Sequence, residues 1–177
     1  VEAGRRLKSD VLRGSVLHAL QRIMQSKVNL RIEGPSAALI PEVFVLLRQT
    51  DRKVKSLALQ LLGDICQMVS TAAPGSPAAA ALAESWSSLD DVVALMSREE
   101  DIFICRQAYK FTGIFVSVAP LDGDEATRQM GAIFDLICNS LSHISPQTLD
   151  HVLVLIHGVA SRNSAMQSAA VAKFIQA

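Results

Sequence analysis

The chain has few aromatic residues and few residues that break helices. Phe, Trp and Tyr make up 5% of its 177 residues, which include nine Gly and six Pro. This composition excludes collagen-like and low-complexity chains. Half of the residues (50%) are hydrophobic, which is enough to form a substantial core without help from disulfides or metals. Because aromatic residues are few, the core must consist mainly of Ala, Leu, Val and Ile, which are typical of closely packed helices.

Long apolar runs and a regular set of cysteines are also missing. The longest apolar runs, residues 78–83 and 152–156, are far shorter than the roughly 18–20 residues of a membrane span. Residues 1–8 do not lead into the apolar stretch of a signal peptide. Cys66, Cys105 and Cys138 are unequally spaced, and their odd number argues against a disulfide framework. We therefore expect an intracellular protein, cytoplasmic or nuclear, with reduced cysteines and no membrane contact.

Catalytic, cofactor and metal motifs are absent from the sequence as well. The histidines have no HExxH or paired-cysteine context, and there is no GxGxxG, P-loop or GxSxG pattern. The acidic loop at residues 122–125 resembles a calcium loop, but Ile133 stands where the twelfth position requires Glu. The sequence thus predicts a protein that is not an enzyme and takes no cofactor, metal or small-molecule substrate.

The formal net charge is zero, but the charge is divided unevenly along the chain. Residues 1–55 contain 11 Lys and Arg against 5 Asp and Glu, and the remaining residues have the opposite imbalance. Such asymmetry favours an alternative function, association with nucleic acid or chromatin through the basic half. The basic residues are dispersed, however, and Phe44, the one aromatic residue in this stretch, gives no interleaved pattern for base stacking. We expect most of them to solvate outer helix faces.

The most informative feature is an internal repeat of 50 residues, which relates residues 40–66 to residues 90–116. The matched pairs are Val43 and Val93, Arg48 and Arg98, Asp51 and Asp101, Ala58 and Ala108, and Gly63 and Gly113. A third copy at an offset of 45 places Leu149, Leu153, Ile156 and Gly158 on Ile104, Ala108, Phe111 and Gly113. Repeats of this length are usual in helical solenoids. We expect the small Ala and Gly residues to lie where neighbouring helices approach closely.

Apolar spacing predicts helices along the whole chain, and no run alternates as a strand does. Pro35 and Pro41 are expected to start two separate short helices, and a long apolar helix covers residues 51–69. Further helices start near residues 77, 88, 101 and 146, another surrounds residues 133–141, and residues 163–177 form one more. The first helix, residues 9–26, is predicted to bury Leu12, Val16, Leu20, Ile23 and Met24. Trp86, the only Trp, is expected to pack inside.

One pattern of apolar and small residues extends over residues 40–65. Its members are Ile40, Pro41, Leu47, Val54, Ala58, Leu61, Leu62, Gly63, Asp64 and Ile65, and weaker versions follow at residues 89–116 and 133–160. This pattern resembles an armadillo repeat. The resemblance implies an all-α fold, a right-handed α-solenoid of about three armadillo-like units with flanking helices. HEAT repeats and irregular helical arrays are alternatives.

We treat residues 1–177 as one armadillo-like domain. Its units are about residues 1–34 (partial), 35–70, 76–119, 124–161 and 162–177 (partial). Because the chain does not begin with Met and the last helical pattern continues to Ala177, we expect it to be part of a longer solenoid.

The resemblance also implies that the last helix of each unit lines a groove that binds partners. By position, the groove residues are Ser56, Gln60, Asp64 and Gln67, then Arg106, Lys110, Ile114 and Ser117, then His151, Leu155, Val159 and Arg162. The Trp and Asn residues that peptide-binding armadillo proteins carry on this helix are absent. Leu155 and Val159 are apolar and are expected to face another helix, which would close the groove of the third unit.

The predicted function is a non-catalytic scaffold that binds a partner protein through the groove or a flank. The candidate binding residues in the groove are Gln60, Asp64, Arg106 and Lys110. Arg52, Lys53 and Lys55 form a candidate basic rim. A regulatory helical segment of a larger enzyme is a further alternative to the nucleic-acid hypothesis.

Overall fold

The computed structural model describes residues 10–25, 33–49, 51–71, 75–98, 101–121, 123–140 and 144–162, and these residues form helices and no strand. The elements are α2 (Asp10–Gln25), α3 (Glu33–Leu46), α4 (Arg52–Ser70), α5 (Pro77–Glu84), the 3-10 helix η1 (Ser85–Ser88), α6 (Leu89–Arg98), α7 (Ile102–Val118), α8 (Asp124–Ser140) and α9 (Pro146–Arg162). The all-α prediction is confirmed for this part of the chain. The helix predicted for residues 163–177 lies outside the described residues.

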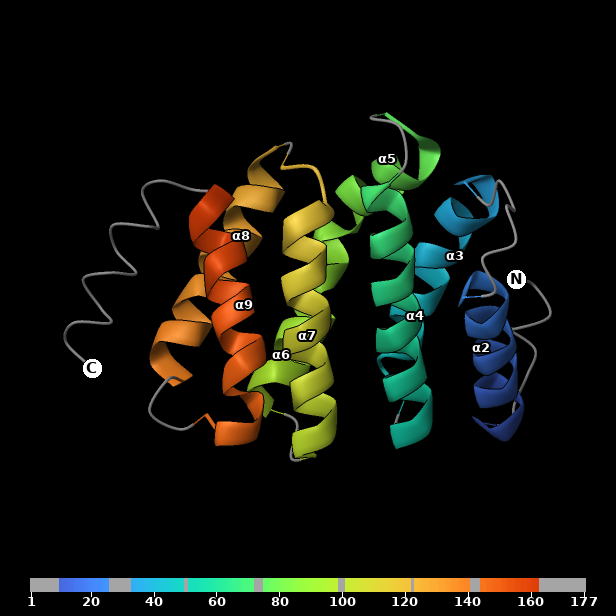
Figure 1. Cartoon of the computed structure of the whole chain (residues 1–177), viewed down its shortest axis with the longest axis horizontal. Helices are drawn as coiled ribbons and strands as arrows, with labels where there is room; N and C mark the ends of the chain where they lie inside the picture. The colour runs from blue at the N-terminus through green and yellow to red at the C-terminus, as the bar shows by residue number, and fades with distance from the viewer. Residues whose placement is uncertain are drawn as a thin grey trace.

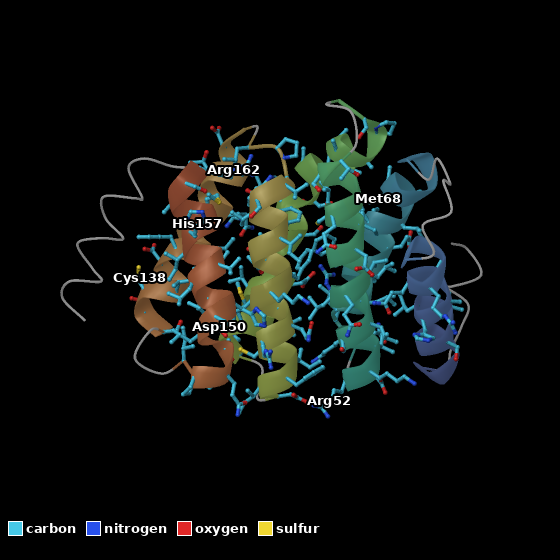
Figure 2. The ribbon with its side chains drawn as sticks, in the orientation of Figure 1. Arg52, Met68, Cys138, Asp150, His157 and Arg162 are labelled. Carbon is cyan, nitrogen blue, oxygen red and sulfur yellow. The ribbon has the colours of Figure 1, made fainter. Side chains whose placement is uncertain are left out.

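The helices form two layers (Figure 1). In the first layer α2, α4, α7 and α9 lie side by side in a row, and each contacts the next. The helices α4, α7 and α9 run in the same direction. Arg52 and Asp150 lie toward the lower ends of their helices in the view, and Met68 and Arg162 lie toward the upper ends (Figure 2). The second layer contains α3, α5, η1, α6 and α8. One continuous apolar core includes buried residues from both layers.

The repeated aspartates start equivalent helices in the first layer. The Asp51 carboxylate accepts a hydrogen bond from the backbone N–H of Val54 at 2.8 Å, and Asp101 accepts one from the N–H of Phe103 at 2.9 Å. A side-chain acceptor at this position satisfies an N–H that has no partner within the helix. The match between Asp51 and Asp101 therefore marks the same position, the N-cap, in α4 and α7.

Trp86 packs inside, as predicted. Its side chain is buried in η1, and its ring meets the Phe115 ring edge-on, with the centroids 4.9 Å apart. The indole N–H donates a hydrogen bond to the Pro120 carbonyl at 2.7 Å. These contacts connect the second layer to the C-terminal end of α7 and satisfy the one polar group of the side chain.

Glycines allow α7 and α9 to approach closely. A Cβ atom on Gly113 would lie 3.7 Å from backbone atoms of Leu155, and one on Gly158 would lie 3.8 Å from the Gly113 carbonyl oxygen. A Cβ on Gly63 of α4 would instead meet the end of a side chain, Ile114 Cδ1, at 3.7 Å. Two glycines that face each other thus let the backbones of α7 and α9 come together, whereas side chains separate α4 from α7.

The third unit has a different register from the one predicted. Leu149 and Leu153, which the offset of 45 places on buried positions of α7, are 41% and 46% exposed. The buried α7 residues Ile104, Ala108, Phe111 and Phe115 correspond instead to the buried α9 residues Thr148, Val152, Leu155 and Val159, at an offset of 44. A shift of one residue turns a helix by about 100°. The prediction failed because α9 has apolar residues on two faces, and the wrong face was aligned.

Two further expectations are corrected. Among the α2 residues whose burial is described, Gly14, Leu17 and Gln21 are buried, Leu20 is partly buried and Val16 is 42% exposed; the predicted core residues Leu12, Ile23 and Met24 lie outside the described side chains. Within the described residues α2 packs mainly on α4, and the face turned to α4 is the one it buries. Pro35 and Pro41 do not start separate helices, because α3 is continuous and contains Pro41. The Pro41 side chain is exposed, so the helix loses its backbone hydrogen bond on an exposed face.

Candidate interaction groove

A polar groove of about 220 Å³ lies between α4 and α7, with a contribution from α2. It is lined by Gln21, Leu59, Gln60, Gly63, Asp64, Gln67, Gln107, Lys110, Phe111 and Ile114. Its floor is apolar, since Leu59 and Phe111 are buried, and its walls carry amides, a carboxylate and an ammonium group. Pockets for small molecules usually measure about 300–1,000 Å³. The size and polarity of this groove fit one or two side chains of a partner better than a complete small molecule.

Hydrogen bonds hold one wall of the groove in place. The Gln21 amide donates to the Gln60 side-chain oxygen at 3.1 Å, and the Gln60 amide donates to the Ser56 hydroxyl at 3.0 Å. The two bonds connect α2 to α4 and fix the orientation of the Gln60 amide. A fixed amide next to a cavity loses less side-chain entropy on binding than a mobile one.

The structure brings together three of the four groove candidates. Gln60, Asp64 and Lys110 line the groove, but Arg106 does not. Its guanidinium Nε donates a hydrogen bond to His151 Nε2 of α9 at 3.1 Å, on the other side of α7. Arg106 is exposed on α7, the helix that also carries Lys110, but its side chain does not line the groove.

His151 accepts this hydrogen bond only when Nε2 is unprotonated. Desolvation lowers the pKa of His151, and the positive charges of Arg106 and Lys110 lower it further. These effects favour the neutral ring and therefore the bond from Arg106. The hydrogen bond between α7 and α9 is therefore lost when the pH falls far enough to protonate His151.

The predicted groove does not continue between α7 and α9. Leu155 and Val159 are buried, which confirms the expectation that they face another helix. The Arg162 guanidinium, also predicted for the groove, donates hydrogen bonds to the carbonyls of Val116 and, at 2.7 Å, Ala119. It satisfies carbonyl groups at the C-terminal end of α7.

The candidate basic rim lies at the start of α4. Arg52 forms an ion pair with Asp101 at 2.5 Å, and its guanidinium lies 5.2 Å from the centre of the Phe103 ring. Lys53 is exposed and Lys55 is partly buried. Outside this rim, Arg48 forms an ion pair with Asp91 at 3.0 Å. The two arginines described here are therefore balanced by carboxylates of the second half of the chain.

Several groove residues were not predicted from the sequence. Gln107 lies one helical turn before Lys110, so the spacing of three residues on α7 could have identified it. Gln21 comes from α2, which belongs to the partial first unit and was not aligned with the repeats. Its position depends on the packing of α2 against α4, and no local pattern in the sequence specifies that packing.

The described part of the chain contains no group of three or more His, Cys, Asp or Glu side chains that could hold a metal ion. None of its helices is both long and apolar enough to cross a membrane. Comparison with known proteins found no match among protein-family models, curated proteins or solved structures.

Proposed function

We propose that the chain forms a right-handed α-solenoid of about three armadillo-like units with flanking helices and is a non-catalytic scaffold that binds a partner protein. The row of helices α4, α7 and α9, which run in the same direction and start at residues 52, 102 and 146, supports the architecture. The polar groove between α4 and α7 is the observation that carries the function.

The chemistry of the groove suits a segment of protein. Each Gln side chain both donates and accepts hydrogen bonds, as the main chain of a partner does. Asp64 and Lys110 add one charge of each sign, and the apolar floor offers a place for one buried side chain of the partner. A few buried anchors surrounded by polar contacts are typical of protein interfaces.

The neutralised arginines weigh against the nucleic-acid alternative. Arg48 and Arg52 already pair with Asp91 and Asp101, which reduces the positive field that phosphates would meet. Binding of nucleic acid would weaken by about one decade per decade of salt for each phosphate contact. A titration of the full chain with duplex DNA and single-stranded RNA at two salt concentrations tests this alternative.

A site-specific photo-crosslinker tests the proposed function in cells that express the full-length chain. Placed at Gln67, which is exposed and lines the groove, it should capture one partner reproducibly. Placed at Arg98, which is exposed on α6 in the second layer, it should not. Equal capture at the two positions would place the interface outside the groove.

Charge reversal provides a second test of the same site. Lys110→Glu should weaken capture at Gln67 by about tenfold or more, because a like charge at an interface costs at least about 1.4 kcal/mol. Arg98→Glu is the matched control and should leave capture unchanged. A circular-dichroism spectrum of each variant checks that the helices are intact.

A further inference from the structure

Two basic side chains of α7 and a histidine of α9 lie together where these helices meet. Arg106 and Lys110 are exposed and one turn apart on α7, and Arg106 Nε donates a hydrogen bond to His151 Nε2 at 3.1 Å. One turn further along the same face, a Cβ atom on Gly113 would lie 3.6 Å from Val154 Cγ1 of α9. Because this face is turned toward α9, Lys110 lies beside the pair of Arg106 and His151. We call these three residues the basic cluster.

The two cations of the basic cluster are not neutralised within the described part of the chain. No carboxylate there forms an ion pair with Arg106 or Lys110, whereas Arg48 and Arg52 each pair with one. A guanidinium has several N–H donors, and the hydrogen bond to His151 uses only the one on Nε. The N–H groups at the end of the Arg106 side chain therefore remain for a ligand.

We propose that the basic cluster binds a carboxylate side chain, Asp or Glu, of the partner protein. This inference rests on the proposed function, because it gives the chemistry of the partner that the groove holds. A carboxylate accepts two parallel hydrogen bonds from the end of a guanidinium, and an ammonium group one turn away adds another. Lys110 also lines the groove between α4 and α7, so a segment that leaves the groove across α7 passes over the cluster.

The surroundings of the basic cluster favour a carboxylate of a protein over the phosphates of a nucleic acid. A nucleic acid presents a continuous row of charged phosphates and needs a basic track to match it. Asp64 lines the groove on one side of α7, and Asp150 is exposed next to His151 on the other. Both carboxylates would repel such a row. Val154, which is 58% exposed, offers an apolar contact that suits a peptide.

His151 gives the proposed site a pH dependence that can be measured. In the free chain its pKa is lowered by desolvation and by the charges of Arg106 and Lys110, while Asp150 of its own helix acts in the opposite direction. A bound carboxylate adds a negative charge beside the ring and raises the pKa again. Binding therefore takes up a proton. The affinity should rise as the pH falls from about 8 to about 5.5, where Glu is still ionised.

Two short fluorescein-labelled peptides test the proposal with the full chain. In one peptide Glu alternates with Ala, and in the other Gln replaces each Glu. Fluorescence anisotropy at low salt measures the dissociation constant of each peptide. We expect the Glu peptide to bind about tenfold more tightly or more, since charge-assisted hydrogen bonds are about twice as strong as neutral ones. Its affinity should increase severalfold between about pH 8 and about pH 5.5.

Matched substitutions locate the binding of the Glu peptide. Arg106→Gln should weaken it by about tenfold or more, because the bidentate donor is lost. Arg98→Gln removes the same charge from an exposed position of α6 in the second layer and should not weaken it. His151→Gln should remove the increase in affinity at low pH. A circular-dichroism spectrum checks the helices of each variant, and Lys110→Gln replaces Arg106→Gln if that spectrum is altered.

The opposite results would overturn the inference. Equal affinities of the two peptides, or equal weakening by Arg106→Gln and Arg98→Gln, would show only a general attraction of charges. Tighter binding of a single-stranded oligonucleotide of the same net charge, also lost in Arg106→Gln, would assign the cluster to phosphate instead.

Photo-crosslinking at Gln67 separates this inference from the proposed function. If the chain does not distinguish the peptides but capture at Gln67 is intact, only the carboxylate site is wrong. If capture at Gln67 fails but the peptides are distinguished through Arg106, the carboxylate site stands and the groove is wrong.

Discussion

Substitution of Gly113 tests the close packing of α7 against α9, on which the row of helices depends. A Cβ atom at this position would lie 3.6 Å from Val154 Cγ1 and 3.7 Å from the Leu155 backbone, which are ordinary contact distances. Gly113→Ala therefore fits without displacement and gains helix propensity of about 0.8–1 kcal/mol. For a chain of this size we expect the melting temperature to rise by about 2–4 °C.

A longer side chain at the same position should have the opposite effect. Gly113→Leu adds three carbons that point into the α9 backbone, and overpacking of this kind costs about 1–3 kcal/mol. Gly63→Leu is the matched control, because the side-chain end of Ile114, next to the groove, can move aside. We expect Gly113→Leu to melt several degrees below Gly63→Leu when thermal unfolding is followed by circular dichroism at 222 nm. If the two leucine variants melt together, the close approach of α7 and α9 is wrong. If Gly113→Ala lowers the melting temperature, the space for a Cβ atom at this position is wrong.

Three further predictions concern stability and pH. Trp86→Ala should lower the free energy of unfolding, measured with a chemical denaturant, by about 3–5 kcal/mol because it empties a buried site. Trp86→Phe should lower it less, because this variant loses mainly the hydrogen bond to Pro120. Equal losses in the two variants would contradict this packing. Asp101→Ala should cost about 1 kcal/mol, and Asp101→Asn, which retains an N-cap acceptor but loses the charge that pairs with Arg52, should cost less. The pKa of His151 is lowered in the folded chain, so the unfolded chain binds the proton first and the free energy of unfolding should fall as the pH drops below about 6.5. His151→Gln should make the free energy of unfolding less dependent on pH. An unchanged pH dependence in this variant would show that His151 is not the group responsible.

Residue patterns within single helices were enough to predict much of the fold. The long helix from Arg52 was predicted within a residue at each end, because its start is set by Asp51 and its end by the Ser-, Gly- and Pro-rich segment that follows. The spacing of apolar residues also predicted buried positions correctly: Ile104, Ala108, Phe111 and Phe115 in α7, and Val54, Ala58, Leu61, Leu62 and Ile65 in α4.

The candidate groove was predicted in part. The resemblance to armadillo repeats pointed to Gln60, Asp64 and Lys110, and all three line the groove between α4 and α7. The partners of Arg106 and Arg162 were not predicted, because a long side chain reaches several angstroms in any direction. Whether it lines a groove or bonds to the next helix depends on how far apart the two helices lie.

The sequence by itself determined that the described residues fold into helices, where α4 and α7 start, and which small residues permit close contact, because hydrogen-bond caps, apolar period and side-chain volume act within a few residues. Only the tertiary structure decided which of the two apolar faces of α9 is buried, which face of α2 meets α4, and that the groove opens between α4 and α7 but not between α7 and α9. These outcomes depend on the separation and rotation of neighbouring helices. Residues about 45–50 positions apart set that geometry together, so no local pattern contains it.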